Sequence, residues 1–468
     1  MSTVFFVSVI AGGISCIVLV WLLSGVVGLI PTRYQPAEKP EDDHIQVLVV
    51  GDVGRSPRMQ YHAMSVAKHR RQVDIVGYKE TSRHPDLIGN PRVNMYALPP
   101  QPEVLRWGTL PFFLNIPLKV LWQFWGLFRT LMYDAPAAKW IIIQKLTFYK
   151  NPPSIPTFHV ALMVSLLRGS KLVVDWHNYG YTILAQNKWY YKPLVPIYRW
   201  YETGFGRYLG DVNLAVTNAM ARQLKVKPFN VKRSVYTLHD RPAEVFQPIL
   251  SANERHAFLS RLAETKSVAK DIVEGAVRLI VSSTSWTPDE DFGLLLDALV
   301  SYASTAETAP ILAIITGKGP QKEHYLERIQ ALQDEGKLPG IRILTAWLST
   351  RDYASLLASA DLGISLHKSS SGVDLPMKVV DMFGAGLPVA AYSAFESFSE
   401  LVKEGQNGCG FETSSELADI LTRLLGFSGH EELSRLKKGA VSEGALRWDH
   451  EWDRVVGKVI GLVGEEGT

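Results

Sequence analysis

The chain of 468 residues carries 49 Lys and Arg against 46 Asp and Glu, a formal net charge of +3 at pH 7. This near balance argues against a nucleic-acid-binding protein, and 47% hydrophobic with 20% charged residues excludes a disordered chain. The length is too great for one core and predicts two domains with an appendage. Only Cys16 and Cys409 occur, so we expect no disulfide framework and a reducing compartment for the folded part.

The N-terminal stretch from Val4 to Ile30 contains no charged residue. At about 1.5 Å per residue it would form roughly 40 Å of helix, enough to cross a bilayer with some tilt. A cleaved signal peptide is the alternative, but the start lacks a basic residue and the apolar run is too long. The first basic residues, Arg33 and Lys39, follow the span, so the positive-inside rule predicts a single-pass anchor with the large domains in the cytosol.

Strands that alternate with helices predict two successive parallel α/β sheets, each covered on both faces. The first five expected strands lie at 45–50, 73–78, 139–144, 171–175 and 212–217. The next five lie at 278–283, 311–316, 341–344, 362–365 and 388–391. Because ligands bind beyond the carboxyl ends of such strands, two facing sheets would enclose a cleft.

These patterns predict a chain of six parts. A transmembrane anchor (1–30) and a polar linker (31–44) lead into a first Rossmann-like domain (45–245), a helical linker (246–275), a second Rossmann-like domain (276–440) and a C-terminal helix (441–468).

Residues 104–133 form an aromatic-rich stretch that three cations, Arg106, Lys119 and Arg129, interrupt. A second membrane span is therefore not expected. The pattern suits a helix in the membrane interface and equally a helix packed on the first sheet, and the sequence does not decide between them.

Three polar loops are expected at one edge of the second sheet, where they could share one ligand. The segment 363–391 runs from a strand through a Ser- and Gly-containing loop into a helix, an arrangement that binds phosphate groups. Carboxylates in it could accept hydrogen bonds from sugar hydroxyls, and its cations could stabilise a leaving diphosphate. The candidate donor-binding residues of the three loops are Ser285, Trp286, Gly317, Lys318, Gly319, His367, Ser371, Gly372, Asp374, Lys378 and Asp381.

Two loops of the first sheet carry candidate chemistry. In the loop after the first strand, Gly54 would let a diphosphate approach, and Arg55 and Arg58 could neutralise it with forked hydrogen bonds. A surface turn with solvated arginines is the alternative. Because His177 and Asp52 each follow a strand, either could take a proton from an acceptor hydroxyl, and the sequence does not choose between them.

Other catalytic classes lack their motifs in this chain. We find no paired His or Cys spacing of a metal site, no G-x-x-x-x-G-K-[ST] loop and no G-x-S-x-G elbow. No cofactor is certain, and dependence on a divalent cation stays open.

Long strings throughout the chain resemble the chitobiosyldiphosphodolichol β-mannosyltransferases. They include VLVVGDVGRSPRMQYHA at 47–63, VVDWHNYGYTIL at 173–184, SSTSWTPDEDFGLLLDAL at 282–299 and SSSGVDLPMKVVDMFGAGLPV at 369–389. The resemblance implies a GT-B fold, an endoplasmic reticulum membrane location and inverting transfer of mannose from GDP-mannose to O4 of the terminal GlcNAc of GlcNAc2-diphosphodolichol. It also implies that other mannosyltransferases of the pathway are potential partners.

Given the resemblance, residue roles follow by position. His177 or Asp52 would be the base, with Gly54, Arg55 and Arg58 at the acceptor diphosphate. Lys318 and Lys378 would stabilise GDP, and Asp374 and Asp381 would position mannose or ribose.

The chain departs from related transferases at two points. Many of them have a Glu-x7-Glu pair, whereas this chain has Asp381 at the second place and Asp374 seven residues earlier. An expected Q-N-P-P motif is also split by KLTFYK at 145–150, either a longer loop or an artefact of the gene model. Two alternatives stay open: a membrane-anchored GT-B enzyme with another sugar nucleotide, and a non-catalytic scaffold of a transferase complex.

Overall fold

The computed structural model describes residues 32–106, 111–145, 155–185, 189–249, 251–288, 290–306, 308–426 and 429–464. The chain separates into two compact units, Met1–Val174 with Leu209–Asp211 and Asp175–Tyr208 with Val212–Thr468. The predicted anchor at 1–30 and most of the 145–150 insertion fall outside the described residues. Within the described ranges, no helix has both the length and the apolar character that crossing a bilayer requires.

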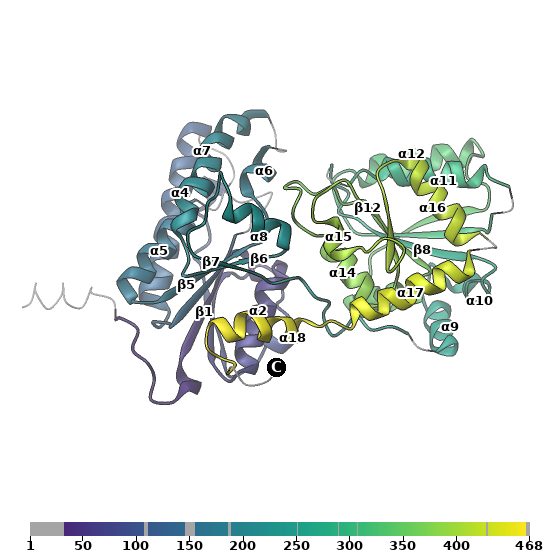
Figure 1. Cartoon of the computed structure of the whole chain (residues 1–468). Coiled ribbons are helices and arrows are strands. Elements are labelled where there is room, and N and C mark those ends of the chain that lie inside the picture. Colours follow the sequence, from purple (N-terminus) through teal and green to yellow (C-terminus); the bar gives the residue numbers. More distant parts are fainter. Residues whose placement is uncertain are drawn as a thin grey trace, which may run out of the picture. The chain divides into compact units, whose positions relative to one another are not determined.

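Two sheets form the framework of the chain, and every pairing recorded between their strands is parallel. The seven-stranded sheet has the order β3-β2-β1-β4-β5-β6-β7, and the six-stranded sheet has the order β10-β9-β8-β11-β12-β13 (Figure 1). The strands of the first are β1 (His44–Asp52), β2 (Gln72–Tyr78), β3 (Val93–Ala97), β4 (Trp140–Lys145), β5 (Lys171–Trp176), β6 (Val212–Ala215) and β7 (Ser234–Thr237). The strands of the second are β8 (Arg278–Ser283), β9 (Ile311–Thr316), β10 (Ile341–Ala346), β11 (Leu362–Ser365), β12 (Val389–Tyr392) and β13 (Gly408–Phe411).

Helices connect most of the successive strands, as parallel pairing requires. Up to β7 they are α2 (Pro57–Lys68), α3 (Glu103–Arg106), α4 (Phe112–Arg129), α5 (Thr157–Arg168), α6 (Gly180–Ala185), α7 (Val195–Trp200) and α8 (Asn218–Lys225). Beyond it they are α9 (Ala252–Arg261), α10 (Ala269–Glu274), α11 (Phe292–Ala303), α12 (Lys322–Asp334), α13 (Thr350–Ser359), α14 (Met377–Gly384), α15 (Phe398–Leu401), α16 (Ser414–Leu425), α17 (His430–Gly444) and α18 (Trp448–Trp452).

The second sheet is buried on both faces, because alternate residues of its central strands enter two different cores. In β8, Ile280 packs with α11 and α16, whereas Leu279 and Val281 pack with α9, α13 and α14. Figure 1 shows α11, α12 and α16 on one face of this sheet and α14 on the other. The continuous apolar run of β8 is therefore a consequence of burial on two sides.

The predicted strands are present, and three further strands were missed. In the second sheet, the predicted bounds of β8, β9 and β11 are those observed. The missed strands β3, β7 and β13 are three of the four edge strands of the two sheets, whereas the fourth, β10, was predicted. Edge strands bury less of their surface and so have a weaker apolar signal; β13 reads only Gly-Cys-Gly-Phe. Gly408 in β13 also permits close packing, since a Cβ there would lie 2.6 Å from the carbonyl oxygen of Val389.

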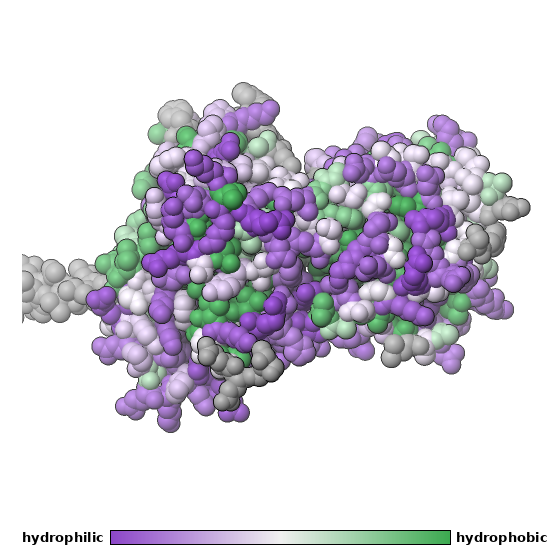
Figure 2. Space-filling view, in the orientation of Figure 1, coloured by the Kyte–Doolittle hydropathy of each residue, from purple (hydrophilic) through white to green (hydrophobic). Residues whose placement is uncertain are grey.

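Helix α4 buries one face in the first unit and exposes the other. Leu127 is buried, and α4 packs beside α5. Leu118, Leu121 and Trp125 are exposed at spacings of three and four residues, which place them on one face of a helix. Figure 2 shows hydrophilic residues mixed with apolar patches on the visible face of the molecule. Both interpretations of this segment therefore remain compatible with its packing.

An ionic network in the second unit joins the segment after β7 to the C-terminal helices. His239 lies 3.2 Å from Glu400 through Nε2 and 3.6 Å from Glu451 through Nδ1. Arg241 pairs with Glu443 at 2.9 Å and with Glu451 at 3.8 Å. Burial lowers the pKa of His239, but hydrogen bonds to the two carboxylates outweigh burial and leave the pKa raised.

The raised pKa of His239 predicts a pH-dependent stability. A group whose folded pKa exceeds its unfolded value of 6.5 contributes its full stability below that pH, and the contribution is lost as pH rises through the folded pKa. We expect His239→Gln to lower the free energy of unfolding by roughly 1.5 kcal/mol at pH 6 and by less at pH 9, measured by urea unfolding. His256→Gln, at an exposed position of α9, is the matched control. An equal or larger loss at pH 9 would contradict this assignment.

Candidate functional site

The loop after β9, which contains Gly317 and Gly319, lies in backbone contact with the loop after β8. Gly317 has φ of +124°, and a Cβ atom there would lie 1.8 Å from the carbonyl oxygen of Thr284. A Cβ at Gly319 would lie 1.7 Å from the carbonyl oxygen of Ser285. Only glycine permits this approach, so the predicted residues of these loops come together because neither glycine has a side chain.

Lys378, in the first turn of α14, forms an ion pair with the buried Glu290. Its ammonium also donates to Ser285 Oγ at 3.1 Å. Burial raises the pKa of Glu290, but the charge of Lys378 and hydrogen bonds from Lys378, Thr284 and Ser285 outweigh it and leave the pKa lowered. Glu290 therefore stays ionised and holds a cation against the loop that follows β8.

Asp374 is the centre of the serine loop that precedes α14. Its Oδ1 accepts hydrogen bonds from Ser369 and, at 2.9 Å, from Ser371, and its Oδ2 lies 3.3 Å from His367 Nε2. Burial raises the pKa of Asp374, but hydrogen bonds and the charge of His367 outweigh it, and the pKa falls to about 2. Gly372, with φ of +76°, donates its N–H to Ser369 Oγ. The carboxylate thus organises the loop itself.

The predicted base His177 follows β5 and lies near a carboxylate that we did not predict. Its Nε2 is 3.4 Å from Asp240 Oδ2, and both side chains are largely buried. The next residue, Asn178, donates to Ser370 Oγ at 3.3 Å and to Asp374 Oδ2 at 3.4 Å. The histidine loop and the serine loop are therefore in contact within the second unit.

Asp381 differs from the other carboxylates because its pKa is raised. Desolvation and the negative charge of Asp240 raise the pKa of Asp381 to about 8, although part of its surface is accessible. At pH 7 the carboxyl is protonated, so it can donate a hydrogen bond and adds no negative charge beside a diphosphate.

Two further residues predicted to bind the sugar nucleotide, Trp286 and Lys318, have different surroundings. Trp286 is 1% exposed and packs in the core against Phe292 and Tyr325, with ring centroids 4.8 and 6.1 Å away. That position favours a packing role for its ring. Lys318 is exposed, and its ammonium lies 4.0 Å from the ring centroid of Trp347, a cation–π contact that holds it over an aromatic face.

Asp52, the other predicted base, lies in the first unit and is surrounded by donors. Its Oδ1 accepts the N–H groups of Glu80 and Thr81 at 3.0 and 3.1 Å, and its Oδ2 accepts the Thr81 hydroxyl. Burial raises the pKa of Asp52, but these hydrogen bonds and one from Gly54 outweigh it and leave the pKa lowered. A carboxylate in this state is a weak proton acceptor and mainly fixes the loop at 80–82.

The predicted acceptor-binding residues lie beside Asp52 but differ in exposure. Arg55 is exposed, and its Nε lies 3.5 Å from Asp52 Oδ2. Arg58, in the first turn of α2, is 1% exposed. Gly54 is required by close packing, since a Cβ there would lie 2.4 Å from the carbonyl oxygen of Ser82. Arg55 is thus the arginine of this pair that reaches solvent.

Metal-ligand clusters were sought among the same residues. In the part of the chain that the structure describes, no group of three or more His, Cys, Asp or Glu residues is arranged to hold a metal ion.

Curated relatives match almost the whole chain, although no protein-family model matches it. A chitobiosyldiphosphodolichol β-mannosyltransferase of Arthroderma benhamiae is 43% identical over 93% of this chain and 95% of its own length. The human protein of the same name is 38% identical, over 88% of this chain and 91% of its own. An Arabidopsis thaliana relative named UDP-glycosyltransferase TURAN is 40% identical over 87% of this chain and 95% of its own length.

The chain belongs to the chitobiosyldiphosphodolichol β-mannosyltransferase family. It is accordingly a glycosyltransferase that adds mannose in N-glycan precursor assembly.

Solved structures agree with this family in fold. Sucrose-phosphate synthase from Thermosynechococcus elongatus superposes with a TM-score of 0.63 at 11% identity, covering 90% of this chain and 99% of that one. Anabaena HepE in complex with UDP and glucose superposes with a TM-score of 0.58 at 13% identity, covering 89% of this chain and 99% of that one. The two Rossmann-like α/β domains of the family member are those of the GT-B fold, as the sequence predicted.

Glu290 and Asp240 are two residues of the candidate site that the sequence analysis did not predict. Glu290 lies within the string at 282–299 that carries the family resemblance, but no role was predicted for it. A buried partner for Lys378 was the signal that could have identified it. Asp240 follows β7, a missed edge strand, so no sequence signal placed it near His177.

The Lys378–Glu290 pair predicts a separation of stability from activity. Lys378→Met leaves a buried carboxylate without its cation and should cost about 3 kcal/mol in urea unfolding, together with most of the transfer activity. Adding Glu290→Gln should restore much of the stability but not the transfer rate, because the cation is still missing.

Lys368→Met is the matched control, since Lys368 forms a more exposed pair with Asp291 at 3.2 Å. Recovery of transfer in the double variant would show that Lys378 acts only on folding.

Proposed function

We propose that this protein transfers mannose from GDP-mannose to O4 of the terminal GlcNAc of GlcNAc2-diphosphodolichol, with inversion at the anomeric carbon. The observation that carries the proposal is identity of about 40% to transferases named for this acceptor over about 90% of the chain. The GT-B fold, with polar loops at the carboxyl ends of β8, β9 and β11, supports a sugar-nucleotide donor on the second sheet.

Inverting transfer needs a base for the acceptor hydroxyl, and His177 suits this role better than Asp52. In one displacement, O4 bonds to the anomeric carbon, its proton passes to the base, and the bond to the GDP β-phosphate breaks. Imidazole accepts a proton near neutral pH, and Asp240 at 3.4 Å would orient the ring and stabilise its charged form. The Asp52 carboxylate is already occupied by hydrogen bonds.

The departing diphosphate needs positive charge, and Lys378 is placed to supply it. Glu290 and Ser285 hold the ammonium beside the loop that follows β8, so little reorganisation is needed when negative charge develops. Asp381, protonated at neutral pH, could donate a hydrogen bond to the donor. Gly317, Lys318 and Gly319 would line the same ligand, and Arg55 would neutralise the acceptor diphosphate.

If His177 is the base, removing it should affect the rate more than folding. We expect His177→Ala to lower transfer to GlcNAc2-diphosphate lipid more than about 100-fold with little change in Tm, and Asp240→Asn to give a smaller loss. His256→Ala is the matched histidine control. A near-normal rate for His177→Ala, beside a large loss for a stably folded Asp52→Asn, would instead assign the base to Asp52.

The identity of the sugar donor is the part of the proposal for which a specific alternative exists. One relative at 40% identity is named as a UDP-glycosyltransferase.

A donor panel therefore tests the proposed function directly. We expect the purified full chain to transfer mannose from GDP-mannose and to ignore UDP-glucose and UDP-GlcNAc at equal concentration. Transfer from a UDP-sugar without transfer from GDP-mannose would overturn the proposal. No transfer from any donor by a protein with normal Tm would favour a scaffold.

The acceptor implies a membrane setting, and two features support one. Residues 4–30 are uncharged, and the exposed face of α4 (Leu118, Leu121 and Trp125) suits the interface of a bilayer. We place the protein in the endoplasmic reticulum membrane with its α/β domains in the cytosol, where a lipid-linked diphosphate would meet α4 and Arg55. Other mannosyltransferases of the pathway are potential partners on the same surface.

A further inference from the structure

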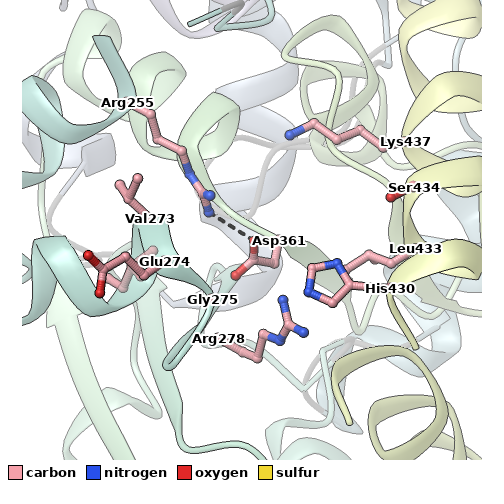
Figure 3. Close-up of a pocket in the computed structure, with 11 residues that line it drawn as sticks. Arg255, Val273, Glu274, Gly275, Arg278, Asp361, His430, Leu433, Ser434 and Lys437 are labelled. Atoms are coloured by element: carbon pink, nitrogen blue, oxygen red, sulfur yellow. Dashed lines mark hydrogen bonds and ion pairs between the residues drawn. The ribbon is translucent and has the colours of Figure 1, made fainter. Parts of the chain in front are cut away.

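A cavity of about 190 Å³ lies at the amino-terminal edge of the second sheet, on the side opposite to the donor loops (Figure 3). Arg278 begins β8 and Asp361 directly precedes β11, and α9, α10 and α17 complete the walls. Because β8 has six residues, the cavity is roughly 20 Å from the loops at the other strand ends. It is therefore not part of the candidate active site.

The two acidic residues of this cavity do not balance its cations. Asp361 accepts from Arg255 Nη2 through Oδ1 and from the Leu279 N–H through Oδ2, both at 2.8 Å. Glu274 is turned away from the other side chains in Figure 3, and its carboxylate lies 3.8 Å from Lys270. Each carboxylate is thus already engaged.

Arg278 supplies a buried positive charge that points into the cavity. Its side chain is 4% exposed, and its Nε donates to the Leu425 carbonyl oxygen at 3.2 Å. Within the described part of the chain, no residue accepts a hydrogen bond from its Nη1 or Nη2. Figure 3 shows the guanidinium directed toward His430. The Nη groups are therefore free to donate to an anion in the cavity.

Two further groups extend the positive charge to the cavity mouth. Lys437 and His430 come from α17, which begins at His430. The amino end of a helix adds partial positive charge. Desolvation and the nearby charge of Arg255 lower the pKa of Lys437, and together they outweigh the opposite effect of the Asp361 carboxylate.

We propose that this cavity is an anion-binding site that holds one phosphate-sized oxyanion, either inorganic phosphate or the phosphate of a small phosphomonoester. Its volume exceeds the roughly 15 Å³ that one water needs but is below the roughly 300 Å³ of pockets for larger ligands. Arg278 would bind two oxygens with its forked Nη groups, and Lys437 and His430 would bind the third from the mouth. The anion would join α17 to the start of β8.

Phosphate titration of the full chain in detergent tests this site. We expect inorganic phosphate to raise Tm saturably, whereas chloride at matched ionic strength does not. Lys437→Ala should weaken phosphate binding roughly tenfold, the scale of one charged hydrogen bond, and Lys438→Ala, the next residue on α17, should not. Both positions are exposed, so neither variant should fail to fold. His430 is also exposed and lines the same cavity, so His430→Ala is a second test of the site.

Two further titrations identify the ligand and locate its binding site. Glycerol phosphate replaces inorganic phosphate in a parallel titration, and tighter binding by either one names the source of the group. The titration is repeated with Lys378→Met, because phosphate held by the donor loops would be lost in that variant. Loss of phosphate binding in Lys378→Met, with binding retained in both Lys437→Ala and His430→Ala, would overturn the proposal. An equal effect of chloride on Tm would also overturn it.

Discussion

The ion pair between Lys378 and Glu290 is the interaction on which the loops of the candidate site in the second sheet depend. It connects the first turn of α14 to the segment after β8, so the helix that follows the serine loop is tied to a neighbouring strand end. The Ser285 hydroxyl and amide join the same cluster. An isolated buried carboxylate would be costly here, and its cost is offset only because the lysine is present. One interaction thus fixes a positive charge in place and anchors two loops.

The carboxylates of the second unit have separate functions because their surroundings push their pKa values in opposite directions. Asp374 accepts several hydrogen bonds, and its pKa falls to about 2. The pKa of Asp381 rises to about 8 because of burial and the negative charge of Asp240. Asp381 occupies one of the two places where related transferases carry paired glutamates, and Asp374 lies seven residues before it. Asp374 is an ionised loop organiser, whereas Asp381 is neutral at pH 7. The seven-residue spacing alone would not distinguish them. Environment, and not residue type, assigns the chemistry.

Sequence reasoning predicted the central strands well because each buries two faces and is a continuous apolar run, as in β8 and β9. It missed β3, β7 and β13, whose edge positions weaken that signal. It also placed candidate loops at the carboxyl ends of strands, where the structure has them, and the family resemblance added the reaction. It could not predict which side chains pair across loops. Asp240 beside His177 and Glu290 beside Lys378 depend on packing between segments about 60 to 90 residues apart in sequence.

The alternation of Leu279 and Ile280 between two cores has a consequence for how the chain tolerates changes in length. A one-residue insertion or deletion within β8 would exchange the side chains that face the two helical layers, and every later contact of the strand would be mismatched. Length changes should therefore accumulate in connections, where no register has to be preserved. The same constraint applies to β4, whose register with β1 runs from Trp140 to Ile143.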